Sequence, residues 1–183
     1  HGGITCTSSN AKAVIDWSWA RREKILFFPD EHLGRNTANK MGLPKEEMIV
    51  WDPFQPNGGN SRGAIQRAKL ILWKGHCSVH QMFQPVHVDN FRKQYPEGKV
   101  IVHPECHEDV VNKADLSGST EFIIKTVTAA PAGTAWAVGT ELNLVNRLKR
   151  DMTDKKVFFL SSTVCQCATM FRIDGAHLCW AME

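Results

Sequence analysis

Six short apolar runs alternate with helix-like segments along the chain, and this alternation constrains the fold more than any other feature. The runs occupy residues 24–28, 48–51, 70–73, 100–102, 134–138 and 157–160. Their apolar residues are consecutive rather than alternating, as in parallel strands that are covered on both faces. We therefore predict an α/β fold with short parallel sheets and right-handed crossovers.

Helix start and stop signals lie between the runs. Polar N-capping residues precede the segments at 10–19 and 31–41, and the second segment ends at Gly42. Further helices are predicted at residues 61–69, 86–95, 105–114, 120–128 and 141–152. The spacing allows two small αβα units with a boundary near residues 77–85. The chain opens on His1 instead of Met and stops inside a helix, so we expect it to be a piece of a longer protein.

Composition excludes several classes of protein. The chain has 183 residues, of which 43% are hydrophobic and 22% are charged, so it has the apolar content for a core and is not disordered. A net charge of +3 gives no argument for a nucleic-acid partner. No apolar run approaches the length of a membrane span, and no signal peptide is visible. We expect a cytoplasmic protein with neither a nucleic-acid nor a membrane partner.

The six cysteines allow two interpretations. An even number permits three disulfides, but the chain is no short secreted scaffold, and thiols stay reduced in the cytosol. Some cysteines are then core residues and others are candidate metal ligands.

Polar side chains gather after three of the predicted strands. The run KGHCSVHQ at 74–81 follows one strand, HPECH at 103–107 follows another, and CQC at 165–167 follows the last. Ligands of open α/β sheets bind at the carboxyl ends of strands, so these residues are candidates for a site. A tetrahedral zinc ion could be bound by Cys77, Cys167, His80 and His103. Single, widely separated cysteines suit an iron–sulfur cluster equally well.

Two helix starts offer free backbone N–H groups and hydroxyls to an anion. One carries Thr7 and Ser8, and the other carries Ser119 and Thr120 after Gly118. Either could be an ordinary N-cap, but two such starts facing one pocket would suit a substrate with several negative charges.

A series of motifs closely resembles the quinolinate synthase family. In chain order they are CTSSNA at 6–11, PDEHLG at 29–34, GHCSVH at 75–80, VHPEC at 102–106, GST at 118–120, GTE at 139–141 and CATM at 167–170. The resemblance covers nearly the whole chain.

The resemblance implies a fold of three similar αβα domains around a pseudo-threefold axis, two of which would be present here. Residues 1–81 would be a partial second domain and residues 82–162 the third. Residues 163–183 would form a cluster-ligand loop and the start of the C-terminal helix. The family's first domain and C-terminal end would be missing.

The resemblance also implies a reaction and a cofactor. The family condenses iminoaspartate with dihydroxyacetone phosphate to give quinolinate for NAD biosynthesis, with loss of phosphate and water. A [4Fe-4S] cluster held by three cysteines leaves one iron open as a Lewis acid. L-aspartate oxidase or aspartate dehydrogenase would be the functional partner that supplies iminoaspartate.

Residue by residue, the resemblance assigns Cys77 and Cys167 as cluster ligands, although the CxC spacing leaves Cys165 open for the second position. The third ligand would belong to the missing domain. His103, Glu105 and His80 would be catalytic.

Substrate binding would fall to Thr7, Ser8, Ser119 and Thr120. The alternative hypothesis is a non-catalytic α/β ligand-binding module with a structural zinc site.

Overall fold

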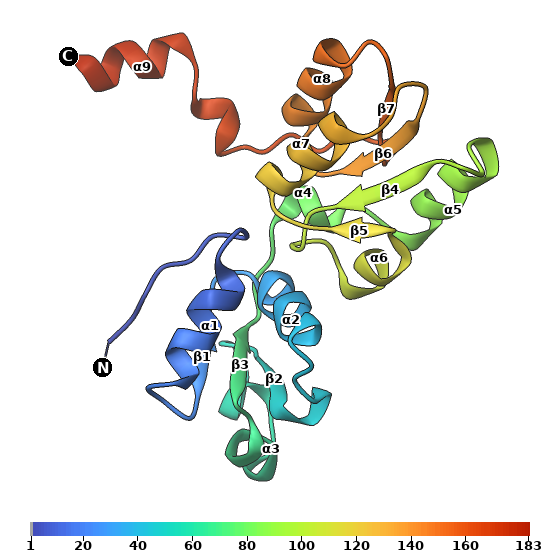
Figure 1. Cartoon of the computed structure of the whole chain (residues 1–183). Helices are drawn as coiled ribbons and strands as arrows, with labels where there is room; N and C mark the ends of the chain where they lie inside the picture. Colours follow the sequence, from blue (N-terminus) through green and yellow to red (C-terminus); the bar gives the residue numbers. More distant parts are fainter. Residues whose placement is uncertain (1) are drawn as a thin grey trace.

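The computed structural model describes residues 2–183 and contains two parallel sheets, each with its own helices (Figure 1). The first sheet has the strand order β1-β3-β2 and the second has the order β5-β4-β6-β7. Every strand pair is parallel. The predicted α/β class with short parallel sheets is therefore confirmed.

The strands are β1 (Ile25–Phe27), β2 (Met48–Trp51), β3 (Leu70–Trp73), β4 (Lys99–Val102), β5 (Leu116–Ser117), β6 (Ala135–Gly139) and β7 (Lys156–Phe159). The helices are α1 (Ala11–Trp19), α2 (Glu31–Lys40), α3 (Arg62–Arg67), α4 (Ser78–Gln81), α5 (Pro85–Gln94), α6 (Glu108–Lys113), α7 (Thr120–Ala129), α8 (Leu142–Asp151) and α9 (Gly175–Met182). Short 3-10 turns occupy Lys45–Glu47, Pro56–Gly59 and Met170–Arg172.

The second sheet is the middle layer of an αβα sandwich. Val88 of α5 and Val110 of α6 pack on Val100 and Val102 on one face of β4. On the opposite face, residues of α7 and α8 pack on Ile101, Trp136 and Val138. Because both faces are covered, continuous apolar strands are the sequence pattern that this sheet requires.

The first sheet is less fully covered. Helices α1 and α2 pack through Ile15 and Leu33 on Leu70 and Leu72 of the central strand β3. The edge strand β1 leaves Leu26 51% exposed. The expectation of a strand buried on both faces over residues 24–28 is therefore wrong for β1, because α1 and α2 cover the face that carries Ile25 and Phe27, and Leu26 lies on the opposite face.

Two short elements were not predicted, and one helix starts later than expected. Strand β5 has two residues and α4 has four, too few to produce a periodic pattern. Helix α6 begins at Glu108 and not at 105, because residues 103–107 turn back through the bond from the Cys106 N–H to the His103 carbonyl.

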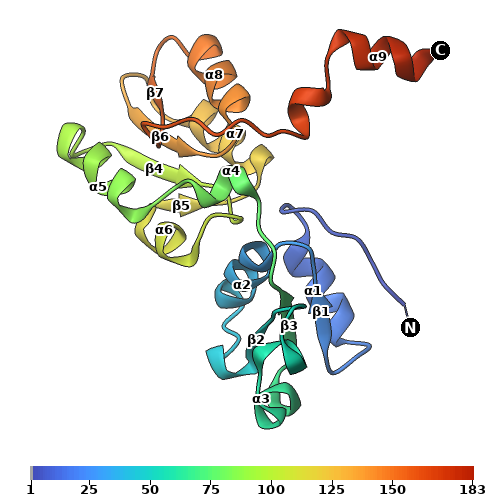
Figure 2. The ribbon, with the colours of Figure 1, turned by 180° about the vertical axis from the view of Figure 1, so that it is seen from behind.

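Helix α2 connects the two groups of elements. It packs on β3 of the first sheet and on α6 beside the second sheet, and α4 lies at the junction of the two groups (Figures 1 and 2). Helix α9 extends away from both sheets. The domain boundaries at residues 81 and 162 stay predictions.

None of the helices within residues 2–183 combines the length and the apolar character needed to cross a bilayer.

Candidate functional site

Cys77 lies where the chain leaves β3 and enters α4, and it is half-buried. Burial alone would raise the pKa of its thiol. The His80 imidazole and the backbone N–H groups of His80 and Val79 outweigh burial, so the pKa of Cys77 is lowered. The thiolate, which is the form that binds metals, is thereby favoured.

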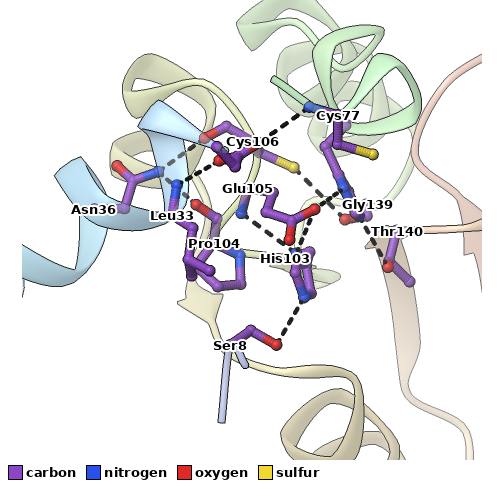
Figure 3. A network of polar contacts seen from close by, with 12 residues as sticks. Ser8, Leu33, Asn36, Cys77, His103, Pro104, Glu105, Cys106, Gly139 and Thr140 are labelled. Atoms are coloured by element: carbon purple, nitrogen blue, oxygen red, sulfur yellow. Dashed lines mark hydrogen bonds and ion pairs between the residues drawn. The ribbon is translucent and has the colours of Figure 1, made fainter. Parts of the chain in front are cut away.

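The side chain of Glu105, on the loop after β4, reaches the segment that carries Cys77 and His80 (Figure 3). Its Oε2 atom lies 2.9 Å from Nδ1 of His80 and 3.8 Å from Nδ1 of His103. The contact with His80 is an ion pair rather than a well-aligned hydrogen bond, since Nδ1 has no hydrogen-bond partner. One carboxylate oxygen therefore faces two buried imidazoles.

The two imidazoles have opposite pKa shifts although they are neighbours. Burial disfavours the charged form of His80, but Cys77 and Glu105 outweigh it and raise the pKa of His80 to about 9. Burial and the charge of His80 lower the pKa of His103 to about 4, against the attraction of Glu105. The pKa of Glu105 is lowered, because the two histidines outweigh the effect of its burial. At neutral pH the site thus holds a carboxylate, an imidazolium and a neutral imidazole.

Hydrogen bonds set the tautomer of His103. The Glu105 backbone N–H donates to Nδ1 of His103 at 3.3 Å, so the proton of the neutral ring lies on Nε2. Nε2 lies 3.1 Å from Oγ of Ser8, which precedes α1 (Figure 3). The first and second groups of elements therefore both contribute to this site.

Sequence analysis missed two polar residues that hold the site together. Thr140, which is 2% exposed, places Oγ1 3.3 Å from Nε2 of His80. Asp30 caps α2 through the Leu33 N–H at 2.7 Å and accepts the Cys77 N–H at 3.0 Å. Thr140 lies in the GTE motif and Asp30 in the PDEHLG motif. Neither motif indicates which residue of the site its polar side chain contacts.

The remaining predicted substrate-binding residues lie outside this network. Thr7 is exposed and bonds locally with Ser9 and Asn10. Ser119 caps α7 by accepting the Phe122 N–H at 3.3 Å, and Thr120 is exposed beside it. Their role in substrate binding stays a prediction.

One group of metal-ligating side chains is present within residues 2–183. The ligand atoms of Cys77, His80 and Glu105 all lie within 4.8 Å of one another. Cys77 and His80 were two of the four zinc ligands predicted from the sequence. The other two, His103 and Cys167, are not in this group, and Glu105 is its third member. Cys167 is half-buried on the segment after β7, where its sulfur accepts the Met170 N–H at 3.4 Å.

Comparison with known proteins identifies the family. The family model described as quinolinate synthetase A protein matches residues 1–183. The quinolinate synthase of Rhodopirellula baltica is 58% identical over 184 residues, which are 100% of this chain and 47% of that protein. Those of a Nocardioides species and of Anoxybacillus flavithermus are 54% and 52% identical, again over 100% of this chain but 48% and 50% of their own lengths.

The chain thus spans about half the length of the curated relatives it matches. The family match extends over its whole length and includes both sheets and every residue of the site. This chain therefore belongs to the quinolinate synthase family.

Proposed function

We propose that the protein to which this chain belongs condenses iminoaspartate with dihydroxyacetone phosphate to give quinolinate, phosphate and two molecules of water. The observation that carries the proposal is the meeting of Cys77, His80 and Glu105 at the carboxyl ends of two parallel sheets, in a chain that matches the family throughout. Proton donors and acceptors accelerate the removal of water and the formation of a ring, and a metal can polarise the leaving hydroxyl; these side chains can serve in both roles.

The donor set fits a metal bound through thiolate. The lowered pKa of Cys77 favours its ionised form, and the Met170 N–H at the Cys167 sulfur is the type of contact that stabilises a cluster thiolate. We assign Cys77 and Cys167 as two ligands of a [4Fe-4S] cluster, with the third ligand outside these 183 residues. When bound, such a cluster supplies an open iron that acts as a Lewis acid toward a substrate hydroxyl or carboxylate.

The residues of the chain provide the proton chemistry. Glu105 is ionised at neutral pH and is the group available to accept a proton. His80 is charged and is the group available to donate one. The opposite shifts of the two pKa values are those of an ion pair, in which the carboxylate and the imidazolium stabilise each other's charge.

His103 remains neutral and orients a substrate group through Nε2–H, which Ser8 Oγ occupies in this structure.

Anion binding is assigned to the helix starts. The carboxylates and the phosphate of the two substrates would be bound at both places. The residues are Ser8 and Thr7 before α1, and Ser119 and Thr120 at α7. Iminoaspartate is an imine that hydrolyses readily in water, so an enzyme that oxidises aspartate must supply it. L-aspartate oxidase or aspartate dehydrogenase in the same cytoplasm fits that requirement.

A zinc site is the second candidate, and one observation favours it. Cys77, His80 and Glu105 offer sulfur, nitrogen and oxygen donors within 4.8 Å, which are ligand types that zinc accepts. A structural zinc ion is almost always four-coordinate, so a non-catalytic module would need a fourth ligand beside these three.

The decisive experiment is anaerobic expression of the full-length protein, followed by measurement of iron, sulfide and zinc and an assay for quinolinate. About four irons with matching sulfide and quinolinate formation would support the enzyme. One zinc per chain without iron or quinolinate would reject it in favour of the ligand-binding module.

A further inference from the structure

Asn36 contacts the loop that carries Glu105 from the other group of elements. It lies on α2, is 2% exposed, and its Nδ2 donates to the carbonyls of Pro104 and Cys106, each at 2.8 Å. These two carbonyls flank Glu105 in sequence (Figure 3). Only an amide nitrogen can face two carbonyl oxygens, so the orientation of the Asn36 side chain is determined by its partners.

The loop depends on this contact because it has no regular secondary structure. Residues 103–107 lie between β4 and α6. Within residues 2–183, no backbone N–H donates to the carbonyl of Pro104 or to that of Cys106. Without Asn36, two largely buried carbonyls would lose their hydrogen-bond partner, and the loop would shift to reach another donor or water.

The position of Glu105 decides which of the two histidines its carboxylate contacts. Its Oε2 atom contacts His80 at 2.9 Å but lies 3.8 Å from His103. A small shift of the loop would exchange these two contacts or break both. The Asn36 amide holds the backbone on each side of Glu105 and thereby restricts how far the carboxylate can move.

Helix α2 also contacts the segment that carries Cys77. Its N-cap Asp30 accepts the Cys77 N–H at 3.0 Å, and Asn36 lies less than two turns further along the same helix. One helix therefore contacts both segments and fixes the position of Cys77 relative to the loop that carries Glu105.

We propose that Asn36 is a positioning residue that places the Glu105 carboxylate against His80 and His103. The inference rests on the proposed function, since Glu105 is assigned there as the proton acceptor. Asn36 itself touches none of the reacting groups and acts through the backbone of the loop.

The test compares Asn36→Ala with Asn39→Ala in the full-length protein loaded with its cluster. Asn39 is a matched control: it lies one turn further along α2, and its Nδ2 donates to Oε1 of Glu108 at 3.0 Å, away from the site. Asn36→Ser is a milder variant that keeps one donor and decides the question if Asn36→Ala does not fold.

We expect kcat to fall roughly 10- to 100-fold in Asn36→Ala, with iron content retained and KM changed less than threefold, because a displacement of about 1 Å in an active site costs about 10²-fold. Asn39→Ala should keep kcat within twofold. If Asn36 acts through Glu105, then adding Asn36→Ala to Glu105→Gln should lower kcat by less than twofold.

A second measurement is independent of activity. Hydrogen exchange of the peptide spanning residues 103–107 should become at least tenfold faster in Asn36→Ala and stay unchanged in Asn39→Ala, since the Cys106 N–H is protected by the turn that Asn36 holds. Unchanged exchange, or a folded Asn36 variant with kcat within threefold of the wild type, would overturn the inference. Because exchange needs no turnover, this result is readable even if the full-length protein makes no quinolinate, an outcome that would count against the proposed function alone.

Discussion

The imidazole rings of His80 and His103 stack with their centroids 4.5 Å apart and their planes inclined by 17°. The same residue type therefore occupies two adjacent buried positions with pKa values displaced in opposite directions, to about 9 and about 4. Contact with Cys77 distinguishes His80, and Glu105 Oε2 lies closer to His80, at 2.9 Å, than to His103, at 3.8 Å. The pair thus carries one positive charge, on His80, over the physiological range.

This arrangement predicts a specific pH dependence of stability for the metal-free chain. Folded His103 stays neutral down to about pH 4, whereas in the unfolded chain it takes up a proton near its ordinary pKa of 6.5. Between pH 6.5 and 4 the unfolded state binds more protons, so the free energy of unfolding falls as the pH falls. The raised pKa of His80 contributes stability that is fully present below pH 6.5 and is lost only as the pH rises through about 9.

The measurement is urea denaturation at pH 7, 6 and 5 for the wild type and for His103→Phe, which keeps a ring against His80. The wild type should lose up to about 1.4 kcal/mol per pH unit more than the variant, the limit for one proton. Parallel pH profiles for the two proteins would show that His103 is not held neutral by its surroundings.

Cluster retention should distinguish the cysteines. In the full-length protein, Cys77→Ala or Cys167→Ala is expected to abolish iron binding, because each removes one thiolate that the assignment requires. Cys179→Ala is the control, since Cys179 is exposed on α9, and it should leave the iron content unchanged. Cys165→Ala resolves which sulfur of the CxC pair is the ligand. Full iron content in both the Cys77 and Cys167 variants would show that the ligands lie elsewhere.

The His103→Ala and Glu105→Gln variants should lose turnover but not iron. One general acid or base contributes about 10²- to 10⁴-fold to a rate, so kcat is expected to drop by that factor. Iron content, measured on the same samples, separates loss of chemistry from loss of assembly. If Glu105→Gln loses its metal together with its activity, Glu105 is a ligand, as the zinc hypothesis requires.

Part of this site follows from the sequence because polar residues that come after parallel strands lie at the carboxyl ends of those strands. Cys77 and His80 are three residues apart after β3, and Glu105 follows β4. Strands β3 and β4 belong to different sheets, however, so a shared sheet edge does not explain why these residues meet. The contacts of Asp30 with Cys77 and of Asn36 with the Glu105 loop could not be predicted in this way. They join residues 47 to 70 positions apart, and a single polar contact over such a separation leaves no periodic pattern in the sequence.

The two serine N-caps provide a matched pair for testing anion binding. Ser119 caps α7 and Ser61 caps α3 with the same geometry, by accepting the N–H three residues on at 3.3 and 3.2 Å. Replacing either with alanine should cost about 1 kcal/mol of stability. Only Ser119→Ala should raise KM for dihydroxyacetone phosphate, by roughly tenfold, the factor for losing one hydrogen bond to a charged group. Equal KM values in the two variants would reduce Ser119 to an ordinary cap.

The 183-residue chain by itself is expected to make no quinolinate and to hold a cluster poorly. The family resemblance assigns three cysteine ligands to the cluster, and Cys77 and Cys167 account for two of them. A cluster with two thiolates has two undercoordinated irons open to water and oxygen, so it should degrade. Cys165 is a poor substitute, because two ligands separated by one residue would crowd one face of the cube.

The surface of the chain supports the same expectation. Large apolar side chains are exposed on α9 and just before it. Ile173 is 83% exposed, Trp180 76% and Met182 78%. Large exposed apolar side chains favour self-association where they lie together. The test is anaerobic reconstitution of the 183-residue chain, followed by an iron count, a quinolinate assay and size-exclusion chromatography. A stable four-iron cluster with measurable turnover would show that these residues suffice, and that the third ligand and the rest of the substrate pocket lie within them.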